Sequence, residues 1–115
     1  MASIDFALAR LVHRTWKFKL RAFLNGERRL TEAEMVSSQE CDLGKWLYTE
    51  AQEKYSDIPE VAQLEVAHDQ LHASARRILH LKESGQAAKA EQEFAKVALL
   101  SEEIISLLTT LEQKV

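Results

Sequence analysis

The sequence predicts an all-α protein, an antiparallel up-and-down four-helix bundle with an additional short helix. Apolar residues recur every three or four positions over long stretches, which is the spacing of one helix face. Only three Gly and one Pro occur among 115 residues, too few for a turn-rich β-sandwich. The connections between the predicted helices are short, which favours antiparallel neighbours. We expect residues 1–115 to form a single domain, because this length suits one hydrophobic core.

The first predicted helix covers residues from about 4 to 25. Its apolar residues form a broad arc around the helix, and His13 falls inside that arc. Gly26 stands where a glycine commonly ends a helix. The arc is broader than one bundle seam needs, with Ile4, Leu11 and Phe18 towards its far edge. Such a surplus often marks an interface, so we expect a homodimer that involves this helix.

Two short helices are predicted next, because two segments match the pattern of a helix-starting capping box. Residues 31–34 read T-x-x-E and residues 37–40 read S-x-x-E. We expect the second of these helices to continue through Trp46 to about Ala51.

Two long helices complete the predicted bundle. Pro59 is tolerated in the first turn of a helix, and we expect this helix to reach Glu83. The pair Ser84–Gly85 predicts its end, and the last helix then covers residues from about 86 to 113.

The formal charge of −3 conceals an asymmetry along the chain. Residues 1–30 carry a net charge of +5, whereas the remaining residues carry −8. Four basic residues of the first helix lie along one stripe: Arg10, Arg14, Lys17 and Arg21. This stripe is either a solvated helix face or a docking surface for an acidic protein partner. We expect no nucleic-acid partner, because such a protein usually carries a stronger basic excess with interleaved aromatic residues.

The cysteine count and the hydropathy indicate a cytoplasmic protein. A single cysteine cannot form an internal disulfide, which suits a reducing compartment. No apolar run approaches the ~18 residues that a membrane span requires, and the N-terminus lacks a signal-peptide pattern. We therefore expect no membrane partner.

Three histidines and the cysteine are candidate metal ligands. His68 and His72 are four apart on one predicted helix, so both project from one face about 6 Å apart. His80 lies about 12 Å further along that helix and is excluded. Cys41 stands near the start of its predicted helix, where the thiolate form is favoured, and His13 is a polar group on an apolar face. Three imidazoles and one thiolate are a common donor set for tetrahedral Zn²⁺.

Other interpretations of these residues remain open. The histidines could be satisfied core residues, and Cys41 could be a small buried hydrophobe. Residues 68–72 also read H-D-x-x-H, close to the H-E-x-x-H of zinc peptidases. Hydrolysis needs an open metal position for water, and four protein ligands would leave none, so we expect no catalytic activity. A metal-free helical adaptor that docks through its basic stripe is the alternative function.

Three motifs together resemble the bacterial chemoreceptor zinc-binding (CZB) domain family. The family signature is H-x-x-W, then C-x-[LF]-G-x-W, then H-x-x-x-H, and residues 13–16, 41–46 and 68–72 carry these motifs in this order. The resemblance implies a helical bundle that holds zinc through three histidines and one cysteine. Carried over to this sequence, the ligands are His13, Cys41, His68 and His72.

The resemblance also implies a regulatory role in bacterial signalling, in domains attached to chemoreceptors or diguanylate cyclases and often dimeric. This chain contains no receptor or cyclase domain, so we expect either a stand-alone member or an excised domain. The expected function is a zinc sensor module in chemotaxis or cyclic di-GMP signalling, with oxidation of Cys41 as a second input. Trp16 and Trp46 are expected to pack near the zinc site.

Overall fold

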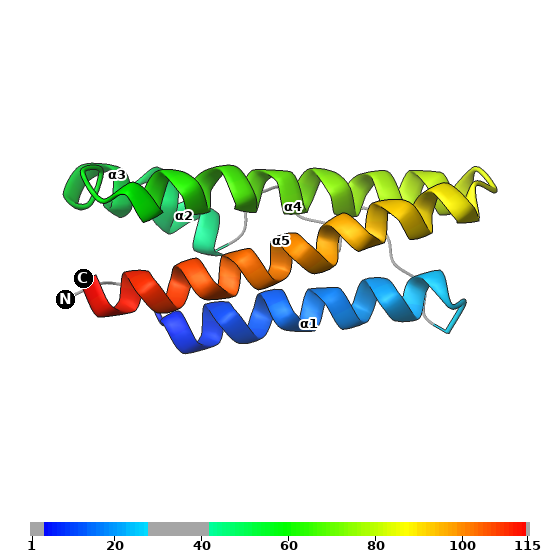
Figure 1. Cartoon of the computed structure of the whole chain (residues 1–115), viewed down its shortest axis with the longest axis horizontal. Coiled ribbons are helices and arrows are strands. Elements are labelled where there is room, and N and C mark those ends of the chain that lie inside the picture. Colours follow the sequence, from blue (N-terminus) through cyan, green and yellow to red (C-terminus); the bar gives the residue numbers. More distant parts are fainter. Residues whose placement is uncertain (1–3, 28–41, 115) are drawn as a thin grey trace.

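The computed structural model describes residues 4–27 and 42–114, which form five α-helices and no strand (Figure 1). The predicted all-α class is therefore confirmed. The helices are α1 (Phe6–Leu24), α2 (Asp42–Tyr48), α3 (Glu50–Lys54), α4 (Pro59–Glu83) and α5 (Ala87–Lys114). None of these helices combines the length and the hydropathy that a bilayer-spanning segment requires.

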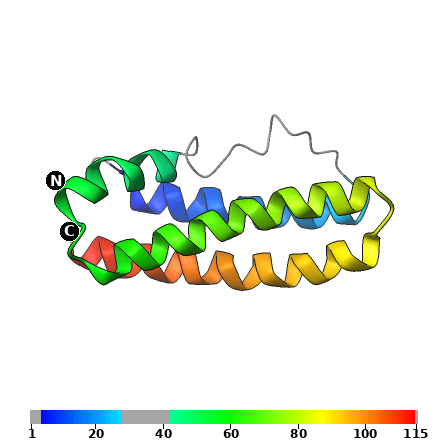
Figure 2. The same cartoon turned by 90° about the horizontal axis from the view of Figure 1, so that it is seen from above.

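The helices run alternately up and down. Helices α1 and α4 point in the same direction, and α5 runs antiparallel to both (Figure 1). The two short helices α2 and α3 follow one another antiparallel to α4 and take the second position of the bundle (Figure 2). Helix α5 packs against both α1 and α4, and α2 packs against α3 and α4. The predicted up-and-down bundle is confirmed, with its second helix divided in two.

Helix α1 begins and ends where the sequence predicts. The side chain of Asp5 accepts a hydrogen bond from the backbone N–H of Leu8 at 3.0 Å, which caps the first turn. At the other end Gly26 adopts a φ of +79°, a conformation that glycine reaches without strain. The predicted range of 4 to 25 differs from the observed helix by only one or two residues at each end.

The turn between α4 and α5 is also as predicted. Pro59 occupies the first turn of α4, where its missing N–H would have no helical partner. Helix α4 ends at Glu83, and Gly85 adopts a φ of +78° in the turn that follows. This tight turn returns the chain as α5, antiparallel to α4.

The second predicted helix is wrong in one respect, because it does not continue unbroken to Ala51. It stops at Tyr48, and α3 starts after Thr49, whose φ of −121° and ψ of −90° are not helical. The hydroxyl of Thr49 donates to the carbonyl of Lys45, so the side chain competes with the backbone for a helical acceptor. The two capping boxes at residues 31–34 and 37–40 lie outside the described residues.

The core is formed by side chains from all five helices. Leu20 of α1, Leu47 of α2, Leu64 of α4 and Leu108 of α5 are completely buried, as is Ala51 of α3. Burial of this apolar surface supplies the main stabilisation of the bundle.

Candidate metal centre

The structure brings three histidines together in the interior of the bundle. His13 comes from α1, whereas His68 and His72 come from consecutive turns of α4. Their exposed fractions are only 2%, 0% and 9%, respectively. One ligand nitrogen from each histidine lies within 4.8 Å of the other two. Two helices far apart in the sequence thus supply one buried cluster, which we call the histidine cluster.

The spacing of the cluster suits a small metal ion. The Nε2 atoms of His68 and His72 lie 3.1 Å apart, and the two ring centroids are separated by 4.5 Å. The ring of His13 lies 5.1 Å from that of His68 and 6.3 Å from that of His72. Tetrahedral zinc with Zn–N bonds of about 2.0–2.1 Å separates neighbouring nitrogens by about 3.3 Å. The α4 pair therefore already has the spacing of two ligands on one ion.

The backbone of α1 fixes the tautomer of His13. Its Nδ1 lies 2.8 Å from the carbonyl oxygen of Ala9, one turn earlier in the helix. A carbonyl oxygen can only accept, so Nδ1 must carry the hydrogen and Nε2 must keep its lone pair. Such a hydrogen bond to the remote nitrogen is the usual way in which proteins orient a metal-binding imidazole.

Burial keeps His13 and His68 uncharged at neutral pH. Desolvation, followed by the proximity of His72 and His13, lowers the pKa of His68 to about 3. Desolvation also lowers the pKa of His13, although its hydrogen bond to Ala9 acts in the opposite direction. Neutral imidazole is the form that binds metal. The Nδ1 of His68 is buried and has no hydrogen-bond partner in the described structure. The buried Nε2 atoms of His68 and His72, 3.1 Å apart, suit a shared zinc ion.

A comparison with known families decides what this cluster belongs to. The family model described as the chemoreceptor zinc-binding domain matches residues 13–79, more than half of the chain. The chain belongs to this family. The matched range begins at His13 and includes His68 and His72, and zinc is the metal that this family binds. No curated protein and no solved structure matches the chain.

The fourth expected ligand of this CZB domain, Cys41, lies outside the described residues. Helix α2 starts at the next position, Asp42. The histidine that the sequence excludes, His80, is exposed and is not a member of the cluster.

One of the two expected tryptophans packs beside the CZB histidines. The Trp16 ring lies 6.4 Å from that of His72, as predicted. Trp46 instead contacts the rings of Phe6 and Tyr55, at 5.8 and 6.1 Å, and is 95% buried. It contributes to the core that holds α2 against α1.

Sequence reasoning missed one polar contact next to the CZB cluster. The hydroxyl of Tyr48 on α2 lies 2.8 Å from each carboxylate oxygen of Asp69 on α4. Asp69 directly follows His68 in the sequence. No spacing rule connects residues on two different helices, so only the tertiary structure could pair them.

Proposed function

We propose that this chain is a zinc-responsive sensor module of bacterial signal transduction, with a site composed of His13, Cys41, His68 and His72. The observation that carries the proposal is the convergence of three buried imidazoles from α1 and α4. A metal ion held by both helices would fix their relative positions, and loss of the ion would release that restraint. The apolar core is extensive enough to fold without metal, so zinc can act as a regulatory ligand.

Metal analysis of the protein, purified without an affinity tag, tests this function. We expect about one zinc ion per chain, because the described residues contain one such cluster, which supplies three of the four proposed ligands. Protein that contains no zinc after purification and binds none on titration would favour the metal-free adaptor instead.

The proposed module has no catalytic activity of its own. A zinc ion with four protein ligands has no free position for the water that hydrolysis requires. The only acidic residue of the H-D-x-x-H segment, Asp69, accepts the hydroxyl hydrogen of Tyr48 on α2 through its carboxylate. Its carboxylate is therefore engaged as a hydrogen-bond acceptor, which does not support a role as general base.

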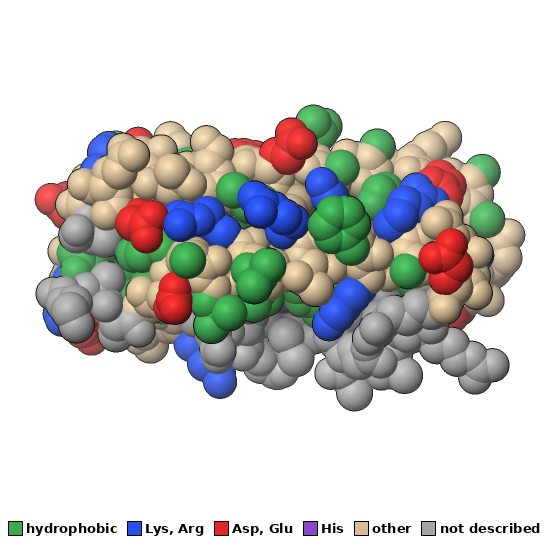
Figure 3. Space-filling view, turned by 90° about the horizontal axis from the view of Figure 1, so that it is seen from below, with side chains coloured by type: hydrophobic (Ala, Val, Ile, Leu, Met, Phe, Trp, Pro, Cys, Tyr) green, Lys and Arg blue, Asp and Glu red, His purple; other side chains and the backbone are tan. Residues whose placement is uncertain are grey.

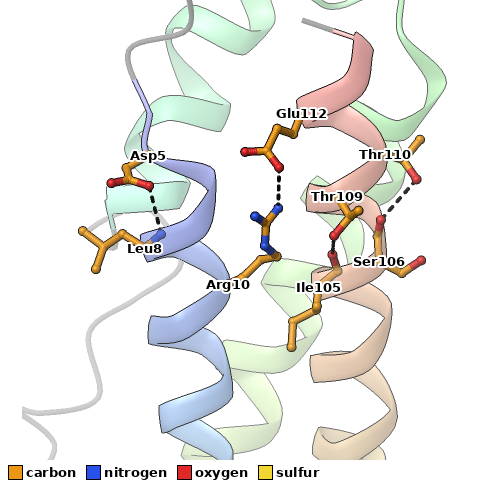
Figure 4. Close-up of polar contacts among 8 residues, drawn as sticks. All are labelled: Asp5, Leu8, Arg10, Ile105, Ser106, Thr109, Thr110 and Glu112. Atoms are coloured by element: carbon orange, nitrogen blue, oxygen red, sulfur yellow. Dashed lines mark hydrogen bonds and ion pairs between the residues drawn. The ribbon is translucent and has the colours of Figure 1, made fainter.

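The alternative function, an adaptor that docks through its basic stripe, gains little support. Arg10 forms an ion pair with Glu112 of α5 at 3.0 Å (Figure 4). Arg21 forms another ion pair with Glu91 of α5. Two of the four stripe residues thus bind α5 within the same chain, which leaves Arg14 and Lys17 for a partner.

We further propose a homodimer formed through the outer face of α1. Leu8, Leu11 and Phe18 on this face are 54%, 56% and 62% exposed, and Val12 is exposed beside them. Figure 3 shows hydrophobic and basic side chains side by side on this surface. Ile4, which the sequence places at the same edge, instead packs partly buried against the core. Exposed apolar surface of this kind is unusual on a monomer and suits a two-fold interface with a second copy.

We expect light scattering to give a mass near 26 kDa, twice the 13.1 kDa of one chain. Phe18→Glu should reduce this mass to that of the monomer, because a charge would be buried at the interface. Leu99→Glu is the matched control, since Leu99 is 70% exposed on α5 and lies on another helix. A wild-type mass near 13 kDa at micromolar concentration, or dissociation by both variants alike, would contradict the proposed interface.

Oxidation of Cys41 is proposed as a second input. A zinc-bound sulfur is a thiolate, and its oxidation to sulfenic acid would weaken the bond to zinc. The chain has one cysteine, so no internal disulfide can trap the oxidised state, and reversal would depend on external thiols.

We expect stepwise addition of hypochlorous acid to release zinc in proportion to the loss of free thiol. A chromophoric chelator reports the released zinc, and thiol titration reports the remaining cysteine. Retention of zinc after the thiol has been consumed would leave zinc sensing as the sole input.

For its cellular setting we propose a single-domain module, residues 1–115, in the bacterial cytoplasm. Its partner would be a chemoreceptor or a diguanylate cyclase, in the same chain or in another one. The single cysteine supports a reducing compartment, and the negative net charge argues against a nucleic-acid partner.

A further inference from the structure

The contact between Tyr48 and Asp69 joins α2 to the metal-binding turn of α4. The tyrosine hydroxyl donates to the carboxylate, with both oxygens at 2.8 Å, in a partly buried position. Asp69 stands one residue after His68 and three residues before His72. Residues three apart in a helix lie on neighbouring positions of its surface, so the carboxylate and the His72 imidazole share one side of α4.

Helix α2 depends on such contacts for its position. It has only seven residues, and a helix this short is not stable by itself in water. Leu43, Trp46 and Leu47 are buried and supply its apolar contacts. Apolar contacts are non-directional, whereas a hydrogen bond to a carboxylate specifies one orientation. Tyr48, the last residue of α2, supplies such a directional contact between this helix and α4.

We propose that Tyr48 and Asp69 are positioning residues that couple zinc binding at the histidine cluster to the docking of α2 on α4. Zinc would hold the turn from His68 to His72 in one orientation, and this turn presents Asp69 to Tyr48. Conversely, the docked Tyr48 would restrain that turn in the orientation that binds zinc. Because such coupling is reciprocal, zinc should stabilise the docked α2 and docked α2 should strengthen zinc binding. This inference rests on the proposed function.

The variant Tyr48→Phe tests the coupling, because it removes the hydroxyl and keeps the ring. We expect the zinc Kd to rise about tenfold, the lower end of the range for residues that orient metal ligands from outside the site. Gln52→Ala is the matched control: Gln52 of α3 donates to Glu65 of α4 at 2.8 Å, so this variant also removes one hydrogen bond to α4. Its zinc Kd should stay within twofold of the wild-type value.

A double-mutant cycle separates coupling from a loss of packing. Asp69→Ala should weaken zinc binding about as much as Tyr48→Phe, and the double variant should be no weaker than either single one. Additive losses would mean that the two residues act independently and would overturn the proposal.

Hydrogen exchange supplies a second readout, independent of the zinc affinity. We expect zinc to slow exchange at the backbone amides of residues 43–48 in the wild-type protein, and this protection to be smaller in Tyr48→Phe. A contact with a structural role alone would lower the stability of the zinc-free protein and leave the zinc Kd unchanged. Wild-type affinity in Tyr48→Phe, or unchanged exchange in α2 on zinc addition, would overturn the coupling alone. Absence of zinc binding in the wild-type protein would instead overturn the proposed function, and this inference with it.

Discussion

Replacement of His72 by alanine is expected to lower the zinc content from about one ion per chain to nearly none. The Nε2 of His72 lies 3.1 Å from that of His68, and both side chains face the ring of His13. Removal of one imidazole leaves two histidines in the cluster, so the proposed four-ligand tetrahedral site is no longer complete. We expect zinc affinity to fall by more than about 100-fold, because even residues that only orient the metal ligands contribute about 10–100-fold.

The control for this variant is His80→Ala on the same helix. His80 is exposed and lies outside the cluster, so its loss should leave the zinc content unchanged. His72→Gln provides a second variant that preserves more of the buried volume, and far-UV circular dichroism verifies that each protein remains helical. Elemental analysis after equilibrium dialysis measures bound zinc. Equal losses in the His72 and His80 variants would refute the site.

The long helices could be predicted because their ends are determined locally. Asp5 caps the first turn of α1, and Gly26 and Gly85 adopt the positive φ angles that end α1 and follow α4. The interruption at Thr49 was not predicted, because the competing interaction is one hydroxyl donating to the carbonyl of Lys45. A threonine within a helix forms this bond in some contexts and continues the helix in others.

The histidine cluster was predictable in part from the sequence alone. The four-residue spacing of His68 and His72 places both on one face of α4, whatever the rest of the fold. The position of His13 within an apolar arc indicated burial, and its exposed fraction of 2% confirms this. Helix α5 packs against both α1 and α4, and this packing determines that the two helices meet at these histidines. No local sequence pattern encodes such packing. The contact between Tyr48 and Asp69 is unpredictable for the same reason.

The zinc-free protein is expected to lose stability as the pH falls from 7 to 5. Burial lowers the pKa of His68 to about 3 and also lowers that of His13, whereas histidine in an unfolded chain titrates near pH 6.5. Below pH 6.5 the unfolded chain therefore binds more protons than the folded one. The free energy of unfolding is therefore highest above pH 6.5, where these histidines are neutral in both states. It decreases as the pH falls from 6.5 towards 3, because protonation then favours the unfolded chain. We expect a decrease on the order of 2 kcal/mol between pH 7 and pH 5.

Urea unfolding in the presence of a zinc chelator measures this dependence. The window ends at pH 5 because of Glu93. Desolvation raises the pKa of its carboxyl, but the Ser74 hydrogen bond, Arg77 and Lys96 together lower it below its usual value, so its stabilising contribution is lost only as the pH falls below the ordinary carboxyl range. His68→Gln should flatten the slope, because glutamine does not titrate, while His80→Ala should retain it. A stability that is constant from pH 7 to pH 5, or the same slope in wild type and His68→Gln, would show that burial does not lower the pKa of His68 as expected.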